Sequence, residues 1–313
     1  MARVIDIHSH LYPPEFKGIG NIHPSIYDLE GLLAEQEAGG VDTSVISNCM
    51  VLAQKGTANL WDLKLVKIFH DFAGRLVKEY PDRFVGLATA VPFRGKEYLD
   101  EIERAVKEYD LKGIIVNSSL EGEYLDSERA YPLFELVCRL DLPLFIHPPS
   151  VTVGEDKMES IRLVATVGRP FDTTLTVVRM ILSGVLARFP MKLILAHMGG
   201  AIPMLVGRLD YGYEYRHDPG YGSQSYGPWK ADVAENPPSY YIKQMYLDTM
   251  GVHPPALQAC LGTVGVDHVV LGSDFPPVKM PLKRTVDTVK KLNLNPADEE
   301  KVLGGNAARL LKL

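Results

Sequence analysis

The stretch "RVIDIHSH" (residues 3–10) joins an apolar, β-branched run to two histidines that stand one residue apart. In a strand, side chains two residues apart point to the same face, so His8 and His10 should project together from the strand's end. Seven further runs of similar length and character follow, at 41–48, 84–92, 111–119, 142–149, 191–200, 244–250 and 267–274. Most are continuously apolar, which predicts strands that are buried on both faces.

Helical patterns separate most of these predicted strands. Apolar residues recur at helical spacing in residues 59–80, 96–109, 127–140 and 173–189. Strand–helix alternation of this kind predicts parallel strands joined by helical crossovers. We therefore expect an α/β fold, a (β/α)8 TIM barrel with a parallel eight-stranded core, in one domain that spans residues 1–313.

Two connections are longer than usual. Residues 150–172 link the fifth predicted strand to its helix, and residues 210–243 form a Tyr/Gly-rich insertion after the sixth strand. Long irregular connections are often functional lids, although a simple surface excursion is the alternative.

Composition excludes several classes of function. The net charge of −6 and the absence of a Lys/Arg run argue against nucleic acid as a partner. No apolar run approaches the roughly 18 residues of a membrane span, so we expect no membrane association. Three cysteines without CxxC spacing and an N-terminus without a signal-peptide pattern favour a reduced, cytoplasmic protein; the cysteines are Cys49, Cys138 and Cys260.

Five polar residues lie where predicted strands end. His8 and His10 end the first strand, His147 the fifth, His197 the sixth and Asp274 the eighth. Barrels of this type build their active sites at the C-terminal ends of the strands. Imidazoles and a carboxylate that meet there suit one divalent metal ion, zinc first and manganese as the alternative. Packing alone explains a single histidine at a strand end easily, but it explains five such residues poorly.

Two other residues refine this prediction. Lys112 is the only lysine of the fourth predicted strand and lies at its beginning, whereas the strand's end reads "VNSS" (116–119). Without a lysine at the C-terminal end, no carbamylated side chain can bridge two ions, so a single ion is expected. His70 lies within a predicted helix and is expected to be half-buried or at the surface.

The strand-end residues resemble a known family. The His-x-His pair, the two later histidines and the final aspartate resemble the amidohydrolase superfamily. Residues 169–210, 246–277 and 306–313 are similar to its decarboxylase branch, typified by aminocarboxymuconate-semialdehyde decarboxylase and γ-resorcylate decarboxylase. The resemblance extends over nearly the whole chain and implies a barrel with a mononuclear metal site.

The resemblance also implies roles for individual residues. It makes His8, His10, His147 and Asp274 the metal ligands, with a water molecule completing the coordination. It makes His197 the residue that transfers a proton beside that water.

Arg208 matches an arginine that, in the family, reaches a neighbouring subunit's site and holds a substrate carboxylate. This match implies a homodimer. The alternative is a surface arginine that pairs with Asp210 or with solvent.

Two reactions suit such a site. The first is non-oxidative decarboxylation of an aromatic or unsaturated carboxylic acid, in which His197 or Asp274 delivers the proton that replaces CO₂. The alternative is hydrolysis of a lactone, ester or amide by a metal-bound hydroxide. A non-catalytic barrel is disfavoured because no expected metal ligand is missing. Expected substrate contacts, each with a structural role as the alternative, are Asn48, Asn117, Trp61 and Phe275.

Overall fold

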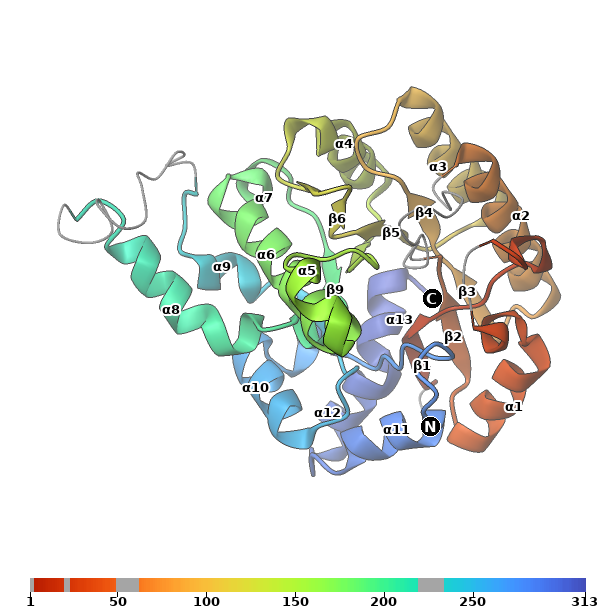
Figure 1. Ribbon diagram of the computed structural model, residues 1–313. Helices are drawn as coiled ribbons and strands as arrows, with labels where there is room; N and C mark the ends of the chain where they lie inside the picture. The colour runs from red at the N-terminus through yellow and green to blue at the C-terminus, as the bar shows by residue number, and fades with distance from the viewer. Residues whose placement is uncertain (1–2, 20–22, 49–61, 219–233) are drawn as a thin grey trace.

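Parallel strands form the centre of the protein (Figure 1). The computed structural model describes residues 3–19, 23–48, 62–218 and 234–313. One sheet has three strands, in the order β1 (Ile5–Ser9), β2 (Thr43–Ile46) and β3 (Phe84–Gly86). A second sheet has six, in the order β11 (Val269–Val270), β10 (Tyr246–Asp248), β9 (Leu193–Leu195), β8 (Leu144–His147), β5 (Ile114–Asn117) and β4 (Ala88–Ala90). All of these strands pair in parallel, which confirms an α/β fold built on parallel strands.

Each predicted strand run contains strand residues, and the run 84–92 contains both β3 and β4. Every residue of β1, β2, β5 and β8 is buried, as expected for continuous apolar runs covered on both faces. A short antiparallel pair, β6 (Ser119–Leu120) and β7 (Glu123–Tyr124), follows β5.

Backbone hydrogen bonds also join β1 to the segment that follows β11. The N–H of Ile7 donates to the carbonyl of Leu271 at 2.9 Å, and the N–H of Asp274 donates to the carbonyl of His8 at 2.7 Å. These bonds place the N-terminal strand, with His8, directly beside the segment that ends in Asp274.

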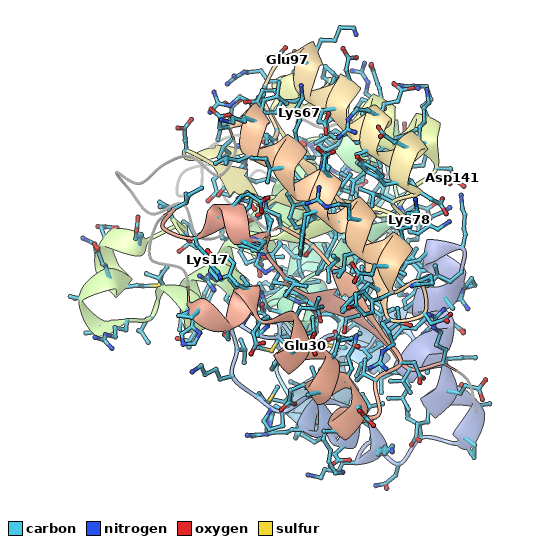
Figure 2. The ribbon with its side chains drawn as sticks, turned by 90° about the vertical axis from the view of Figure 1, so that its right-hand side faces the viewer. Lys17, Glu30, Lys67, Lys78, Glu97 and Asp141 are labelled. Carbon is cyan, nitrogen blue, oxygen red and sulfur yellow. The ribbon has the colours of Figure 1, made fainter. Side chains whose placement is uncertain are left out.

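Helices surround the strands (Figure 1). The described helices are α1 (Leu29–Gly39), α2 (Leu63–Glu79), α3 (Lys96–Tyr109), α4 (Tyr131–Leu140), α5 (Glu155–Met158), α6 (Arg169–Leu182), α7 (Val185–Arg188), α8 (Ile202–Glu214), α9 (Pro238–Ile242), α10 (Pro254–Val264), α11 (Leu282–Lys290), α12 (Pro296–Glu300) and α13 (Asn306–Leu311). Figure 2 shows charged side chains of α1, α2 and α3 on the outer surface, including Glu30, Lys67 and Glu97. None of the helices in the described ranges has the length and apolar character needed to cross a membrane.

One helix prediction needs correction and another is confirmed over the described residues. The pattern at 173–189 is two helices, because α6 begins earlier, at Arg169, and ends at Leu182. Gly184 then adopts a left-handed conformation (φ 79°) that interrupts the helix before α7. The pattern at 59–80 corresponds to α2, where the Asp62 side chain accepts the N–H of Lys64 and caps the first turn.

The two long connections contain more helix than expected. Residues 150–172 include α5 and the first turn of α6. Residues 210–243 begin inside α8 and include α9, and the N–H of Ser239 donates to Asp210 at 2.9 Å to join these two helices. Residues 219–233, the middle of the predicted insertion, lie outside the described residues.

His70 is neither half-buried nor at the surface, so that prediction is wrong. It is fully buried on α2, with Nδ1 2.8 Å from Oε1 of Glu101, and its Nε2 accepts the N–H of Thr89 at 2.8 Å. Burial lowers the pKa of His70, which favours a neutral ring with one donating and one accepting nitrogen. Its partners come from α3 and β4, which the periodicity of α2 does not reveal.

Candidate metal centre

The strand ends bring all five predicted polar residues into one cluster. The ring centroid of His8 lies 5.2 Å from that of His10, 5.0 Å from that of His147 and 5.3 Å from that of His197. The carboxylate of Asp274 contacts three of these rings: Oδ1 is 3.1 Å from His10 Nε2 and 3.4 Å from His8 Nε2, and Oδ2 is 3.3 Å from His197 Nε2. The cluster is buried except for His197, whose side chain is 12% exposed.

Four residues of the cluster have potential ligand atoms that all lie within 4.8 Å of one another: His8, His147, His197 and Asp274. This set contains His197 in place of His10. His10 nevertheless touches the same carboxylate, so distance alone leaves both histidines close enough to act at a shared ion.

Hydrogen bonds separate the histidines more clearly. In three rings Nδ1 faces an oxygen acceptor, and the pairs are His8 with Asp248 Oδ2 (2.6 Å), His10 with the Ser47 carbonyl (3.2 Å) and His147 with the Pro148 carbonyl (2.9 Å). Carbonyl and carboxylate oxygens only accept, so these Nδ1 atoms carry the hydrogen, and in the neutral form of each ring Nε2 has the lone pair that faces the cluster. This is the arrangement that metal-binding histidines usually show.

His197 differs from the other three. Its Nδ1 is buried without a hydrogen-bond partner among the described residues, and its Nε2 faces Asp274. A carboxylate only accepts, so the hydrogen of a neutral His197 ring lies on Nε2, the reverse of the other three histidines. His197 is also the most exposed member of the cluster, at 12% of its side chain.

The donor set fits a divalent cation. The Nε2 atoms of His8 and His147 are buried and find no hydrogen-bond partner in the described part of the chain. Buried polar atoms are rarely left unsatisfied, and nitrogen lone pairs beside a carboxylate are typical ligands of zinc and related ions. The expectation of a divalent metal site thus agrees with the geometry.

Charges in the cluster depend strongly on one another. Burial would raise the pKa of Asp274, but the charge of His8 and hydrogen bonds from the imidazoles hold it well below its usual range. Burial would lower the pKa of His8, but the carboxylates of Asp274 and Asp248 outweigh it and raise that pKa to about 9. A cation that binds Nε2 of His8 at neutral pH must therefore displace a proton.

Unusual backbone angles orient two members of the cluster. His197, Met198, Gly199 and Gly200 all have positive φ, between 55° and 71°, and Asp274 has φ 57°. A Cβ at Gly200 would lie 2.1 Å from the carbonyl oxygen of Pro170, so only glycine fits there. The turn "HMGG" is thus packed tightly against the start of α6.

Two buried aspartates near the cluster were missed by the sequence prediction. Asp248 is the last residue of β10, and its place at the C-terminal end of a strand was the available signal. Asp6 lies in β1 and accepts hydrogen bonds from the hydroxyls of Ser9 and Ser273. By strand alternation Asp6 shares a face with His8 and His10, so this spacing and the charge inside an apolar strand were the available signals.

Three of the four predicted substrate contacts lie in the described part of the chain. Asn48 is buried after β2, Asn117 ends β5 in register with His147, and Phe275 directly follows Asp274. The Oδ1 atom of Asn117 has no hydrogen-bond partner among the described residues. Trp61 lies outside the described residues.

Arg208 is not part of this cluster. It lies on the exposed face of α8, the helix that extends away from the strands in Figure 1. Within the described ranges it forms no ion pair, and Asp210 instead accepts the N–H of Ser239. The alternative of an Arg208–Asp210 pair is therefore not observed.

Comparisons with known proteins agree with the expected branch. The chain is 29% identical over 297 residues to a 2-amino-3-carboxymuconate-6-semialdehyde decarboxylase from Dictyostelium discoideum, covering 93% of this chain and 79% of the relative. The structure matches 5-carboxyvanillate decarboxylase from Sphingomonas paucimobilis with a TM-score of 0.84, at 25% identity and with 100% of both chains covered.

A third match is a dihydroxybenzoic acid decarboxylase from Polaromonas sp. JS666, solved with bound manganese and the inhibitor 2-nitroresorcinol. Its TM-score is 0.83 at 22% identity, with 100% of this chain and 98% of that chain covered. The resemblance to decarboxylases is thereby confirmed. A family model described as amidohydrolase matches residues 5–313, and the chain therefore belongs to the amidohydrolase family.

Proposed function

We propose that this protein is a metal-dependent decarboxylase that removes CO₂ without oxidation from a small aromatic or unsaturated carboxylic acid. The main support is the convergence of three imidazole Nε2 atoms and the Asp274 carboxylate at the strand ends. The Dictyostelium, Sphingomonas and Polaromonas proteins described above are decarboxylases, which supports this reaction over hydrolysis of an ester, lactone or amide.

His8, His10, His147 and Asp274 are the proposed ligands of one divalent ion. The hydrogen on each Nδ1 leaves Nε2 of the three rings available, which favours His10 over His197 as the third nitrogen ligand. Zinc is consistent with the three nitrogens, and the manganese of the Polaromonas decarboxylase supports manganese as the alternative. When bound, the ion would orient the substrate carboxylate and an adjacent oxygen and would stabilise developing negative charge.

Side chains of this chain would supply the remaining chemistry. Loss of CO₂ leaves a carbon that must accept a proton, and His197 is the proposed donor through Nε2. Asp274 Oδ2, 3.3 Å away, would hold that imidazole in position. The proposed substrate contacts are Asn48, Asn117, Phe275 and Trp61. The Oδ1 atom of Asn117 has no partner among the described residues and would accept a hydrogen bond from a hydroxyl of the substrate.

Carbon balance tests the proposed reaction. Metal-loaded protein incubated with hydroxybenzoates should release one CO₂ per product molecule, and removal of the metal with a chelator should stop turnover until manganese or zinc is restored. Gas analysis and product mass spectrometry measure both quantities. Turnover of small lactones with gain of water and no CO₂ would replace this proposal with the hydrolase alternative.

We also propose that the strands close into an eight-stranded (β/α)8 barrel within a single domain, residues 1–313. Support comes from the bonds between β1 and the β11 segment and from the continuity of β3 and β4 across Leu87. The insertion 210–243 would then follow the sixth barrel strand. An experimental structure in which β1 and β11 lie apart would contradict this closure.

Arg208 is proposed to act in the site of a second subunit, which makes the protein a homodimer. Its exposure on α8, beside Met204 that is 78% exposed, supports a face that another subunit covers. Mixed dimers of Arg208→Ala and His197→Asn should regain activity that neither variant has alone, because one site per dimer is intact. No recovery in mixed dimers of confirmed composition would show that Arg208 does not act across subunits.

A further inference from the structure

Asp248 connects three segments of the candidate metal centre. It ends β10 and is fully buried. Its Oδ2 lies 2.6 Å from Nδ1 of His8, while its Oδ1 accepts the N–H of Met198 at 2.8 Å and that of Met250 at 3.1 Å. Because Met198 directly follows His197, one carboxylate joins a proposed metal ligand to the turn that bears the proposed proton donor.

The first contact fixes the ring of His8. A carboxylate that faces Nδ1 keeps the hydrogen on that nitrogen and directs Nε2 toward Asp274, 3.4 Å away. An imidazole with the hydrogen on Nε2 has no lone pair there and cannot bind a cation through that atom. The orientation of His8 as a ligand thus depends on Asp248.

The second contact holds the turn after β9. His197 (φ 55°) and Met198 (φ 59°) both adopt left-handed conformations that are unfavourable for residues other than glycine. Such a backbone persists when surrounding bonds stabilise it, and Asp248 Oδ1 accepts the N–H in the middle of the turn. The position of the His197 ring therefore also depends on this carboxylate.

A glycine provides the space for this arrangement. The segment that follows β11, residues 271–274, bonds to β1, and a side chain at Gly272 in this segment would lie between Asp248 and His8. At Gly272, a Cβ would lie 2.9 Å from Cβ of Asp248 and 3.0 Å from Cβ of His8. Thr249 accepts the N–H of Gly272 at 3.0 Å and holds it in place.

We propose that Asp248 is a positioning residue that orients His8 for metal binding and holds the His197 turn, with Gly272 as the position that lets it reach His8. The inference rests on the proposed function, because it assumes that His8 binds a cation. This role does not require Asp248 to contact the substrate.

Asp248→Asn tests the contact to His8 selectively. The asparagine Oδ1 can still accept the two backbone N–H groups, but its Nδ2 would donate toward His8 and move the ring hydrogen to Nε2. Affinity for Zn²⁺, measured by competition with a chelator on folded protein, should fall by about 10- to 100-fold. Excess Zn²⁺ or Mn²⁺ should restore part of the activity.

Asp172→Asn is the matched control. Asp172 is a fully buried carboxylate that accepts hydrogen bonds from Ser118, Ser119 and Tyr124, and it contacts none of the clustered histidines. This variant should lose stability but keep wild-type affinity for Zn²⁺. If both variants lost affinity for Zn²⁺ equally, the cause would be the loss of any buried charge. That result would overturn the positioning role of Asp248.

Two further measurements keep the outcomes separate. In zinc-loaded wild-type protein, nitrogen NMR should find the His8 hydrogen on Nδ1. A hydrogen on Nε2 would overturn the inference, and this measurement needs no variant to fold. Wild-type affinity for Zn²⁺ in Asp248→Asn would also overturn it. Gly272→Ala should weaken Zn²⁺ binding in the same way. If wild-type protein binds no Zn²⁺ or Mn²⁺, the proposed function itself fails.

Discussion

Replacing His147 with alanine is expected to remove both the bound metal and the activity. Burial, with the neighbouring imidazoles adding to its effect, lowers the pKa of His147 well below its usual value, so the ring is neutral and available as a ligand. Its Nδ1 donates to the carbonyl of Pro148, and its buried Nε2 has no other partner among the described residues. Metal content after dialysis, measured by elemental analysis, should fall from about one ion per chain to near zero.

His70→Gln is a suitable control for this loss. His70 is also fully buried and hydrogen-bonded, but its partners are Glu101 and the backbone of Thr89. The variant should become less stable while keeping the metal content of the wild type. A His147→Ala protein that kept its ion and its turnover would remove the central assignment of the site.

His197→Asn is expected to lower kcat by roughly 10²- to 10⁴-fold while metal content stays unchanged. Asparagine keeps a polar group near Asp274, but it cannot release and recover a proton near neutral pH. Because the substrate would still bind the ion, KM should change much less than kcat. Steady-state kinetics and elemental analysis on the same samples separate these effects.

The same experiment decides between His10 and His197 as a ligand. The four atoms within 4.8 Å of one another include His197, whereas the hydrogen-bond pattern favours His10. His10→Ala should therefore lose the metal, and His197→Asn should retain it. The opposite result would exchange the two roles and contradict the proposed proton donor.

The positions of the histidines at strand ends were predictable, because they follow from the local pattern of apolar residues. The runs that contain β1, β8 and β9 are apolar and end in histidine, and parallel strands bring their C-terminal ends to one side of a sheet. The convergence of His8, His147 and His197 with Asp274 could therefore be inferred before any coordinates. Family membership agreed, because the same residues resemble the amidohydrolases.

Details of helices were less predictable. The periodicity at 173–189 continues across Gly184, where a left-handed glycine ends the helix. His70 has the spacing of a helix residue, but its burial depends on Glu101, which is 31 residues away in the sequence. An apolar pattern reports the side of a helix that faces inward, and it does not report which polar residue finds a partner there.

The sequence by itself determined which strands end in functional residues, where the apolar runs lie and which family the chain resembles. Each of these features is encoded in residues that are neighbours along the chain. Only the tertiary structure decided that Asp248 meets His8, 240 residues earlier, and that Gly272 leaves room for this contact. It alone also decided which nitrogen of each ring faces the cluster. These features depend on strands that become neighbours only when the chain folds, and no local pattern specifies distances between them.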